Sequence, residues 1–274
     1  MALRHILVHV DDSDLCASRL ELAIWLAKKF QALLTGFFAE NDPRVMTVAL
    51  LDVERDLAPR VARAEASFRA LVQTAGVRAD WVAAMTVSDV ALFREAVFAT
   101  QACDLAILGQ HDPSRFDIRV PAELAEQVVL HSGRPVLIVP RSGRFSTIGR
   151  RVMIAWNSGR EAARALNDAI PLLQAAEHVM LVAINVEQRG KALQGELFSH
   201  VMRHLAAHGV RVEIDRMIVE DIGAMDMLLG RLTDEAIDLL VMGAHGHYGF
   251  PYMHRGGSTR HILRQMTVPV MMSH

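Results

Sequence analysis

The sequence has little cysteine, few aromatic residues and no marked excess of charge of one sign. Two cysteines, Cys16 and Cys103, in 274 residues predict no disulfide framework and favour a reducing compartment. Both are expected to be buried apolar side chains rather than reactive thiols. Aromatic residues make up 5% of the chain, so Ala, Leu, Val and Met must fill the core. A formal net charge of -2 without a long basic run argues against nucleic acid or an anionic membrane surface as the main partner.

Long hydrophobic runs and familiar catalytic motifs are missing as well. No stretch reaches the roughly 18 to 20 apolar residues of a membrane helix, so we expect no membrane span. The first residues, MALRHILVHVDDS, lack the longer apolar core and cleavage site of a signal peptide, and we expect a cytoplasmic protein. Neither the P-loop GxxxxGK[ST], nor the serine elbow GxSxG, nor a zinc signature occurs. The prediction is therefore no dedicated enzyme, and at most a slow ATPase.

The sequence does contain an internal repeat. Residues 4–10, RHILVHV, resemble residues 150–156, RRVMIAW, and DLAILG at 104–109 resembles DLLVMG at 238–243. PVLIVP at 135–140 likewise resembles PVMMSH at 269–274. The extra residues of the first half are expected after Glu40. We predict two domains, residues 1–140 and 148–274, joined by a short polar linker at 141–147.

Each half alternates β-rich runs with helical patterns, which predicts βαβ units and a parallel sheet. Gly76 and Gly209 suit left-handed C-caps before the third strands, and Ser158 with Glu161 fits a capping box. The predicted fold class is α/β, with two tandem doubly wound parallel sheets covered by helices on both faces. Strands are expected at residues 6–10, 33–38, 77–84, 105–108 and 135–140, and again at 152–156, 179–184, 210–217, 239–242 and 269–274.

A glycine-rich segment in the second half points to an anion site. Glycine lets backbone amides approach a ligand, and the first amides of a helix attract negative charge. The hydroxyls can cap the helix or donate to phosphate. Four histidines nearby lack the spacing of metal ligands, and we expect them to face solvent or phosphate; they are His245, His247, His254 and His261. The segment runs Gly243-Ala-His-Gly246, then nine residues, then Gly256, Gly257, Ser258 and Thr259.

On these residues the chain resembles the universal stress protein family. The family's phosphate loop is Gly, two residues, Gly, nine residues, then Gly and Ser or Thr, and here Gly257 stands at the hydroxyl position. The resemblance implies two five-stranded sheets ordered 3-2-1-4-5 and a site for ATP or another nucleotide, and leaves the need for magnesium open. The resemblance also places Asn157 at the position where ATP-binding members usually have an Asp that contacts the nucleotide. The nucleotide site is predicted to comprise Ala155, Trp156, Asn157, Gly243, His245, Gly246, Gly256, Gly257, Ser258 and Thr259.

The first half has lost most of this pattern. Asp11 and Gly109 remain as a vestigial site, but Gln110, His111 and Asp112 follow where a second glycine would stand. Three carboxylates, at Asp112, Asp117 and Glu123, would repel phosphate by about 1 kcal/mol per pair even in water at 4 Å. We predict a degenerate half that has a scaffolding role, mimics a dimer partner or binds a different ligand.

The predicted function is a nucleotide-binding stress-response or signalling protein. The ligand would order the loop at residues 244–257 and change a surface that an unknown signalling protein recognises. Alternatives are a module for a lipid or another phosphate-bearing metabolite, a scaffold without ligand, or a phosphotransferase or hydrolase. Because C-terminal strands build dimers in the family, residues 135–140 and 269–274 are expected to pair within the chain. A further homodimer is compatible with this pattern.

Overall fold

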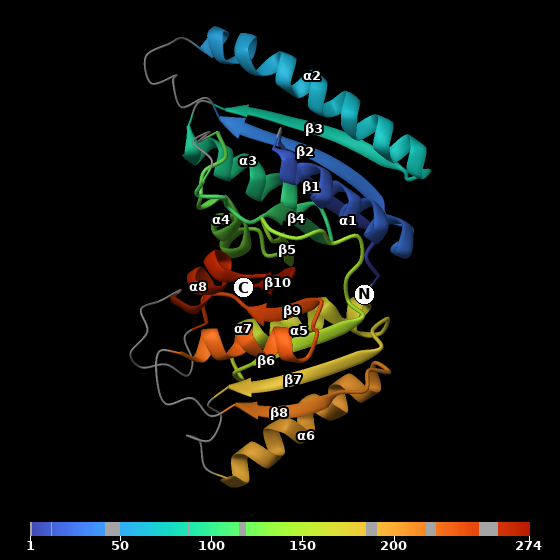
Figure 1. Ribbon diagram of the computed structural model, residues 1–274, viewed down its shortest axis with the longest axis vertical. Helices are drawn as coiled ribbons and strands as arrows, with labels where there is room; N and C mark the ends of the chain where they lie inside the picture. Colours follow the sequence, from blue (N-terminus) through green and yellow to red (C-terminus); the bar gives the residue numbers. More distant parts are fainter. Residues whose placement is uncertain are drawn as a thin grey trace. The chain divides into compact units, whose positions relative to one another are not determined.

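The computed structural model describes residues 2–11, 13–41, 50–86, 88–114, 119–184, 191–217, 223–246 and 257–274. The chain divides into two compact units, Ala2–Thr147 and Ile148–His274. Each unit is built around its own parallel strands, with helices between successive strands (Figure 1).

The N-terminal unit is a parallel sheet ordered β3-β2-β1-β4-β5. Helices α1 and α2 contact each other, as do α3 and α4, which places one pair on each face, as right-handed crossovers require. Its elements are β1 (His5–Val10), α1 (Asp14–Phe30), β2 (Leu33–Asn41), α2 (Leu50–Ala75), β3 (Ala79–Thr86), α3 (Asp89–Gln101), β4 (Leu105–Gly109), α4 (Leu124–His131) and β5 (Val136–Val139).

The C-terminal unit repeats this order as β8-β7-β6-β9-β10, again with parallel pairs. Helix α5 packs on β6, β9 and β10, and α7 contacts α8 (Figure 1). The predicted α/β fold class and the 3-2-1-4-5 order are confirmed. The elements are β6 (Arg151–Trp156), α5 (Arg160–Leu173), β7 (His178–Ile184), α6 (Lys191–Ala207), β8 (Glu213–Met217), α7 (Ala224–Asp234), β9 (Leu239–Gly243), α8 (Gly257–Gln265) and β10 (Val270–Ser273).

The third strands begin later than the sequence predicts. Gly76 and Gly209 adopt φ of +67° and +74°, as expected of left-handed helix ends. The next residue in each unit still belongs to the helix end, because Val77 N donates to Val72 O at 3.0 Å and Val210 N to Leu205 O at 2.9 Å. The strands therefore start only at Ala79 and Glu213.

The strand order changes direction at one place in each unit, between β1 and β4 and between β6 and β9. All strands of a unit point the same way, so their carboxyl ends lie at one edge. Parallel α/β sheets bind ligands in the crevice outside this point. The residues that follow β1, β4, β6 and β9 therefore form the candidate ligand edge of each unit.

Candidate functional site

In the C-terminal unit the turn from β6 into α5 forms one wall of the candidate site. Asn157 follows β6, and its Oδ1 accepts a hydrogen bond of 2.9 Å from Gly159 N. The predicted capping box is wrong: the N-cap is Gly159, which makes no side-chain cap. Ser158 instead has φ of +61°, and its buried hydroxyl has no partner among the described residues. The tight turn at Asn157 rotates Ser158 out of the capping position.

Gly243, the last residue of β9, touches the backbone at the start of α5. A Cβ atom at this position would lie 2.5 Å from Ala162 N and 2.5 Å from the carbonyl carbon of Glu161. Real Cβ atoms do not approach other atoms this closely, so any side chain here would push helix and strand apart. Gly243 therefore allows the first turn of α5 to lie directly on the carboxyl end of β9 (Figure 1).

The backbone after β9 is held at two points. His245 N donates to Thr259 Oγ1 at 2.8 Å, and Thr259 on α8 is 2% exposed. Ala244 N donates to Ser273 O at 2.9 Å, while His274 Nδ1 donates to Ala244 O at 2.9 Å. The described start of the glycine-rich segment is thus fixed to both α8 and β10.

The structure brings most of the predicted nucleotide residues to this edge. Ala155 pairs with Met242 in the sheet, and Trp156 is 7% exposed with its indole Nε1 unpartnered in the described part of the chain. Gly257 and Ser258 open α8. Gly256 lies outside the described residues, as do His247 and His254.

The sequence pattern assigns Glu161 to a helix cap and does not predict that its side chain lies at this edge. Glu161 is 4% exposed, and a Cβ atom at Gly246 would lie 3.3 Å from its Oε2 and 3.6 Å from Asn157 Nδ2. Arg160 Nε donates to Glu161 Oε1 at 2.7 Å. Burial alone would raise the pKa of Glu161, but hydrogen bonds from Arg160 and from its own amide outweigh burial and lower that pKa. The candidate site therefore contains a buried, ionised carboxylate.

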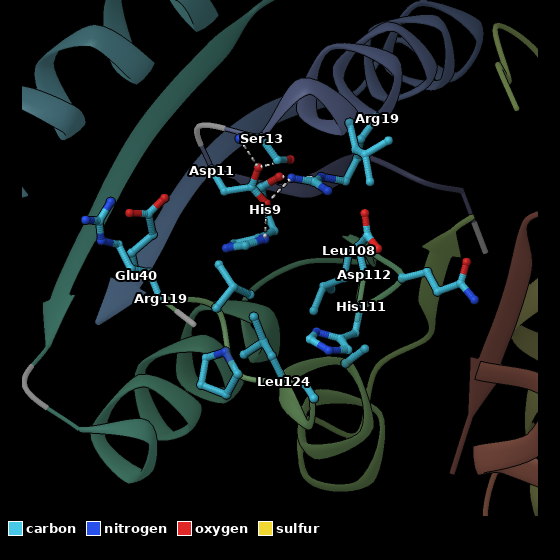
Figure 2. A pocket seen from close by; sticks show the side chains of 17 residues that line it. His9, Asp11, Ser13, Arg19, Glu40, Leu108, His111, Asp112, Arg119 and Leu124 are labelled. Carbon is cyan, nitrogen blue, oxygen red and sulfur yellow. Dashed lines mark hydrogen bonds and ion pairs between the residues drawn. The ribbon is translucent and has the colours of Figure 1, made fainter. Parts of the chain in front are cut away.

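The N-terminal unit has a cavity at the equivalent edge of its sheet. The cavity measures about 70 Å³ and lies between the ends of β1, β2 and β4 and the start of α4. Figure 2 shows Asp11, Arg19, Glu40 and His111 around it. Ligand pockets for drug-sized molecules usually measure about 300–1,000 Å³, so this space suits a few waters or a very small polar molecule.

A buried charge pair occupies the position where the family resemblance implied ligand contact. Arg19 Nη2 lies 2.8 Å from Asp11 Oδ2, with side chains 3% and 12% exposed, and Arg19 Nε donates to His9 O at 2.7 Å. Burial alone would raise the pKa of Asp11, but the Arg19 guanidinium outweighs it and, with His9, holds this pKa well below its usual range. Burial also lowers the pKa of His9, whose Nε2 donates to Ala39 O at 3.0 Å. The negative charge of Asp11 is therefore paired with the guanidinium of Arg19 (Figure 2).

Arg19 also lies against Gly109, where a Cβ atom would collide with Nη1 of the guanidinium. A second ion pair involves Glu40, which also lines the cavity: Arg60 Nη2 lies 2.8 Å from Glu40 Oε2. Asp112 lines the cavity too, whereas Asp117 lies outside the described residues. Two carboxylates of the N-terminal site, Asp11 and Glu40, are therefore each paired with an arginine.

Neither edge contains a metal centre in the part of the chain that the structure describes, where no three His, Cys, Asp or Glu side chains cluster suitably. Among the same residues, no helix has the length and apolar character required to cross a bilayer.

The model of the universal stress protein family matches this chain twice, over residues 2–140 and 149–274. The chain belongs to the universal stress protein family. The resemblance stated from the glycine spacing is thereby confirmed, and the two matches agree with the internal repeat. The two edges described above are the equivalent regions of two tandem family domains.

Solved structures and a curated relative support the same fold. A universal stress protein from Archaeoglobus fulgidus DSM 4304 superimposes with a TM-score of 0.75 at 18% identity, over 98% of this chain and 95% of that one. A functionally unknown protein from Pseudomonas aeruginosa PAO1 gives a TM-score of 0.61 at 17% identity, over 99% and 92%. A universal stress protein of Synechocystis sp. PCC 6803 is 24% identical over 172 residues, which are 61% of this chain and 57% of that protein's length.

Proposed function

We propose that this universal stress protein binds an adenine nucleotide, ATP or another, at the edge formed by β6, β9 and α8 of its C-terminal unit. The main support is Gly243, whose missing side chain lets α5 reach the end of β9. Beside it, Gly246 leaves the backbone open next to Asn157. Among the described residues, Trp156 Nε1 and Ser158 Oγ are buried polar atoms without a hydrogen-bond partner. Such atoms cost free energy unless a ligand or water satisfies them.

The proposed action is a binding response rather than catalysis. Nucleotide contacts would fix the connection between β9 and α8, residues 244–257, in a form that another protein recognises. Family membership supports a role in the stress response.

The test is calorimetric titration of the full chain with ATP, ADP and AMP. Gly246→Asp would place a second carboxylate beside the proposed ligand, close to Glu161 Oε2. Like charges 4 Å apart repel by about 1 kcal/mol in water and about 4 kcal/mol near a protein surface. We therefore expect affinity to fall about tenfold or more, since each tenfold corresponds to about 1.4 kcal/mol.

A matched control is Gly230→Asp, because Gly230 on α7 has no described atom within 4 Å of a Cβ placed there and is not one of the residues of the proposed site. It introduces the same charge and should leave nucleotide affinity unchanged. Equal binding by Gly246→Asp and the wild type would remove Gly246 from the site, and no binding of any nucleotide by the wild type would refute the proposal.

The N-terminal cavity favours a different ligand. Its volume of about 70 Å³ is too small for a nucleotide, and two of its carboxylates, Asp11 and Glu40, are already paired with Arg19 and Arg60. We propose a small polar metabolite there, or water alone. Mass spectrometry of molecules released from the purified protein distinguishes the two: recovery of a small metabolite in stoichiometric amount supports a ligand, and its loss from a variant with a filled cavity would assign it to this unit.

A further inference from the structure

Each unit has a carboxylate at the carboxyl-end edge of its own sheet, but the two carboxylates come from different positions of the repeat. Strand register aligns Ile6 with Val152, because they pair with Leu105 and Leu239 of the repeated DLAILG and DLLVMG segments. Continuing along the chain, Asp11 aligns with Asn157 and Leu15 with Glu161. The N-terminal unit thus has Asp and Leu where the C-terminal unit has Asn and Glu.

Local geometry supports this alignment. In both units the aligned Asx side chain accepts a hydrogen bond from the backbone nitrogen two residues on, at 2.9 Å from Ser13 and at 2.9 Å from Gly159. In both units the helix begins at the next residue, Asp14 or Arg160. The two units therefore have the same number of residues between strand and helix. The carboxylate occupies a different position of the repeat in each unit, and this difference is not an error of alignment.

The Glu161 carboxylate lies beside the amide of Asn157. A Cβ atom at Gly159 would stand 3.0 Å from Asn157 Oδ1 and 3.2 Å from Glu161 Oε2, and the same Oε2 faces Gly246. The aligned Leu15 lines the N-terminal cavity, which indicates that this helix position faces the ligand edge in both units. Glu161 therefore puts a negative charge at the place where Asn157 has none.

An ionised carboxylate only accepts hydrogen bonds, which determines the ligand group it can hold. Adjacent hydroxyls of a ribose ring are suitable donors, and a carboxylate performs this task at the edge of other nucleotide-binding parallel sheets. We propose that Glu161 binds the ribose hydroxyls of the nucleotide in the C-terminal site and makes that site selective for ribonucleotides. This inference rests on the proposed nucleotide binding.

The experiment compares ATP with 2′,3′-dideoxy-ATP, which lacks both hydroxyls, by calorimetric titration of the full chain. The wild type should bind ATP more tightly by tenfold to a hundredfold, on the order of what hydrogen bonds to a charged group contribute. Glu161→Leu, which copies Leu15, should bind the two ligands about equally. Glu161→Gln keeps the side-chain shape and should reduce the preference, so it serves if the leucine variant does not fold.

A rescue variant and a control separate ligand contact from a structural role. Asn157→Asp combined with Glu161→Leu restores the arrangement of Asp11 and Leu15, and should recover the preference for ATP. Glu177→Gln makes the same chemical change in an exposed pair with Arg150, where β6 begins, and should leave the preference intact.

Two failures are distinguishable. If the wild type binds ATP and its dideoxy analogue equally, or Glu161→Leu keeps the wild-type preference, the role of Glu161 is refuted while nucleotide binding stands. If the wild type and the variants bind neither ligand, the proposed function fails and this inference fails with it.

Discussion

Replacing Asp11 by Asn tests how far the buried pair with Arg19 stabilises the N-terminal unit. The side chains are 12% and 3% exposed, with 2.8 Å between Asp11 Oδ2 and Arg19 Nη2. Asparagine has nearly the same volume but no charge, so it leaves a buried guanidinium without a counter-charge. Breaking a buried pair from one side costs about 3–5 kcal/mol, and we expect the free energy of unfolding of this unit to fall by about that amount.

Removing both charges should be far less harmful. Arg19→Met in the Asp11→Asn background replaces the guanidinium by an apolar chain of similar length, at a position where the other repeat has Ala165. Because the double variant leaves no buried charge without a partner, it should recover most of the lost stability. This outcome would show that the single variant fails through the uncompensated charge.

The same pair predicts a pH dependence of stability. Burial opposes ionisation of Asp11, but Arg19 outweighs burial and lowers its pKa below the unfolded value, which is about 3.9. A lowered carboxyl pKa stabilises the fold above the unfolded pKa, and this stabilisation is lost as the pH falls through the folded pKa. As the pH falls below about 4, the wild-type N-terminal unit should therefore lose part of its free energy of unfolding. The Asp11→Asn variant lacks this contribution at every pH and should show no such loss from position 11.

Hydrogen exchange with mass spectrometry can measure the effect in the intact chain. Peptides from β1 and α1 report on the N-terminal unit, and peptides from β6 and α5 provide an internal reference. Urea unfolding at several pH values measures the acid dependence. A loss of less than about 1 kcal/mol in Asp11→Asn would contradict the expected cost of an unpaired buried charge, as would a double variant that is no more stable than the single one.

Two further predictions follow from close packing. Gly243→Ala should lower the free energy of unfolding of the C-terminal unit by about 1–3 kcal/mol, because its Cβ would stand 2.5 Å from Ala162 N. Gly230→Ala, in open space within α7, should raise it by about 0.5–1 kcal/mol; urea unfolding that shows the same change for both would argue against the close approach at β9. Burial raises the pKa of Cys103 to about 12, so iodoacetamide at pH 8 should label this thiol only in unfolded protein, and rapid labelling of the folded chain, detected by mass spectrometry, would be inconsistent with its burial.

The fold could be predicted because its signals are local and occur twice. Alternating apolar runs, glycines at helix ends and a repeated DLxxxG strand each specify one element, and the second half repeats the first. The apolar face of α5 is a local signal of the same kind, since Ala162, Ala165 and Leu166 recur at helical spacing and are all buried. Helix α2 has 26 residues, whereas the corresponding helix α6 has 17. This difference accounts for part of the extra length expected after Glu40.

The side chains at the two edges were harder to predict. Arg19 and Glu161 are long and polar, and what they contact depends on strands that are distant in sequence. Arg19 reaches Gly109 only because β4 lies beside β1. Glu161 at the first turn of α5 has the sequence signature of a local cap, whereas Gly246 beside it and the aligned Leu15 in the N-terminal cavity show that it faces the ligand edge. Local patterns do not contain this information.

The contact between Arg19 and Gly109 alters what the surviving glycine means. Gly109 resembles a remnant of a phosphate loop, yet the guanidinium occupies the volume that any side chain at this position would need. If selection keeps Arg19, its packing alone is enough to retain glycine at position 109, even in homologues whose N-terminal unit binds no nucleotide. Mutational change at the two positions should consequently be correlated, with larger residues tolerated at 109 only after the arginine has been replaced.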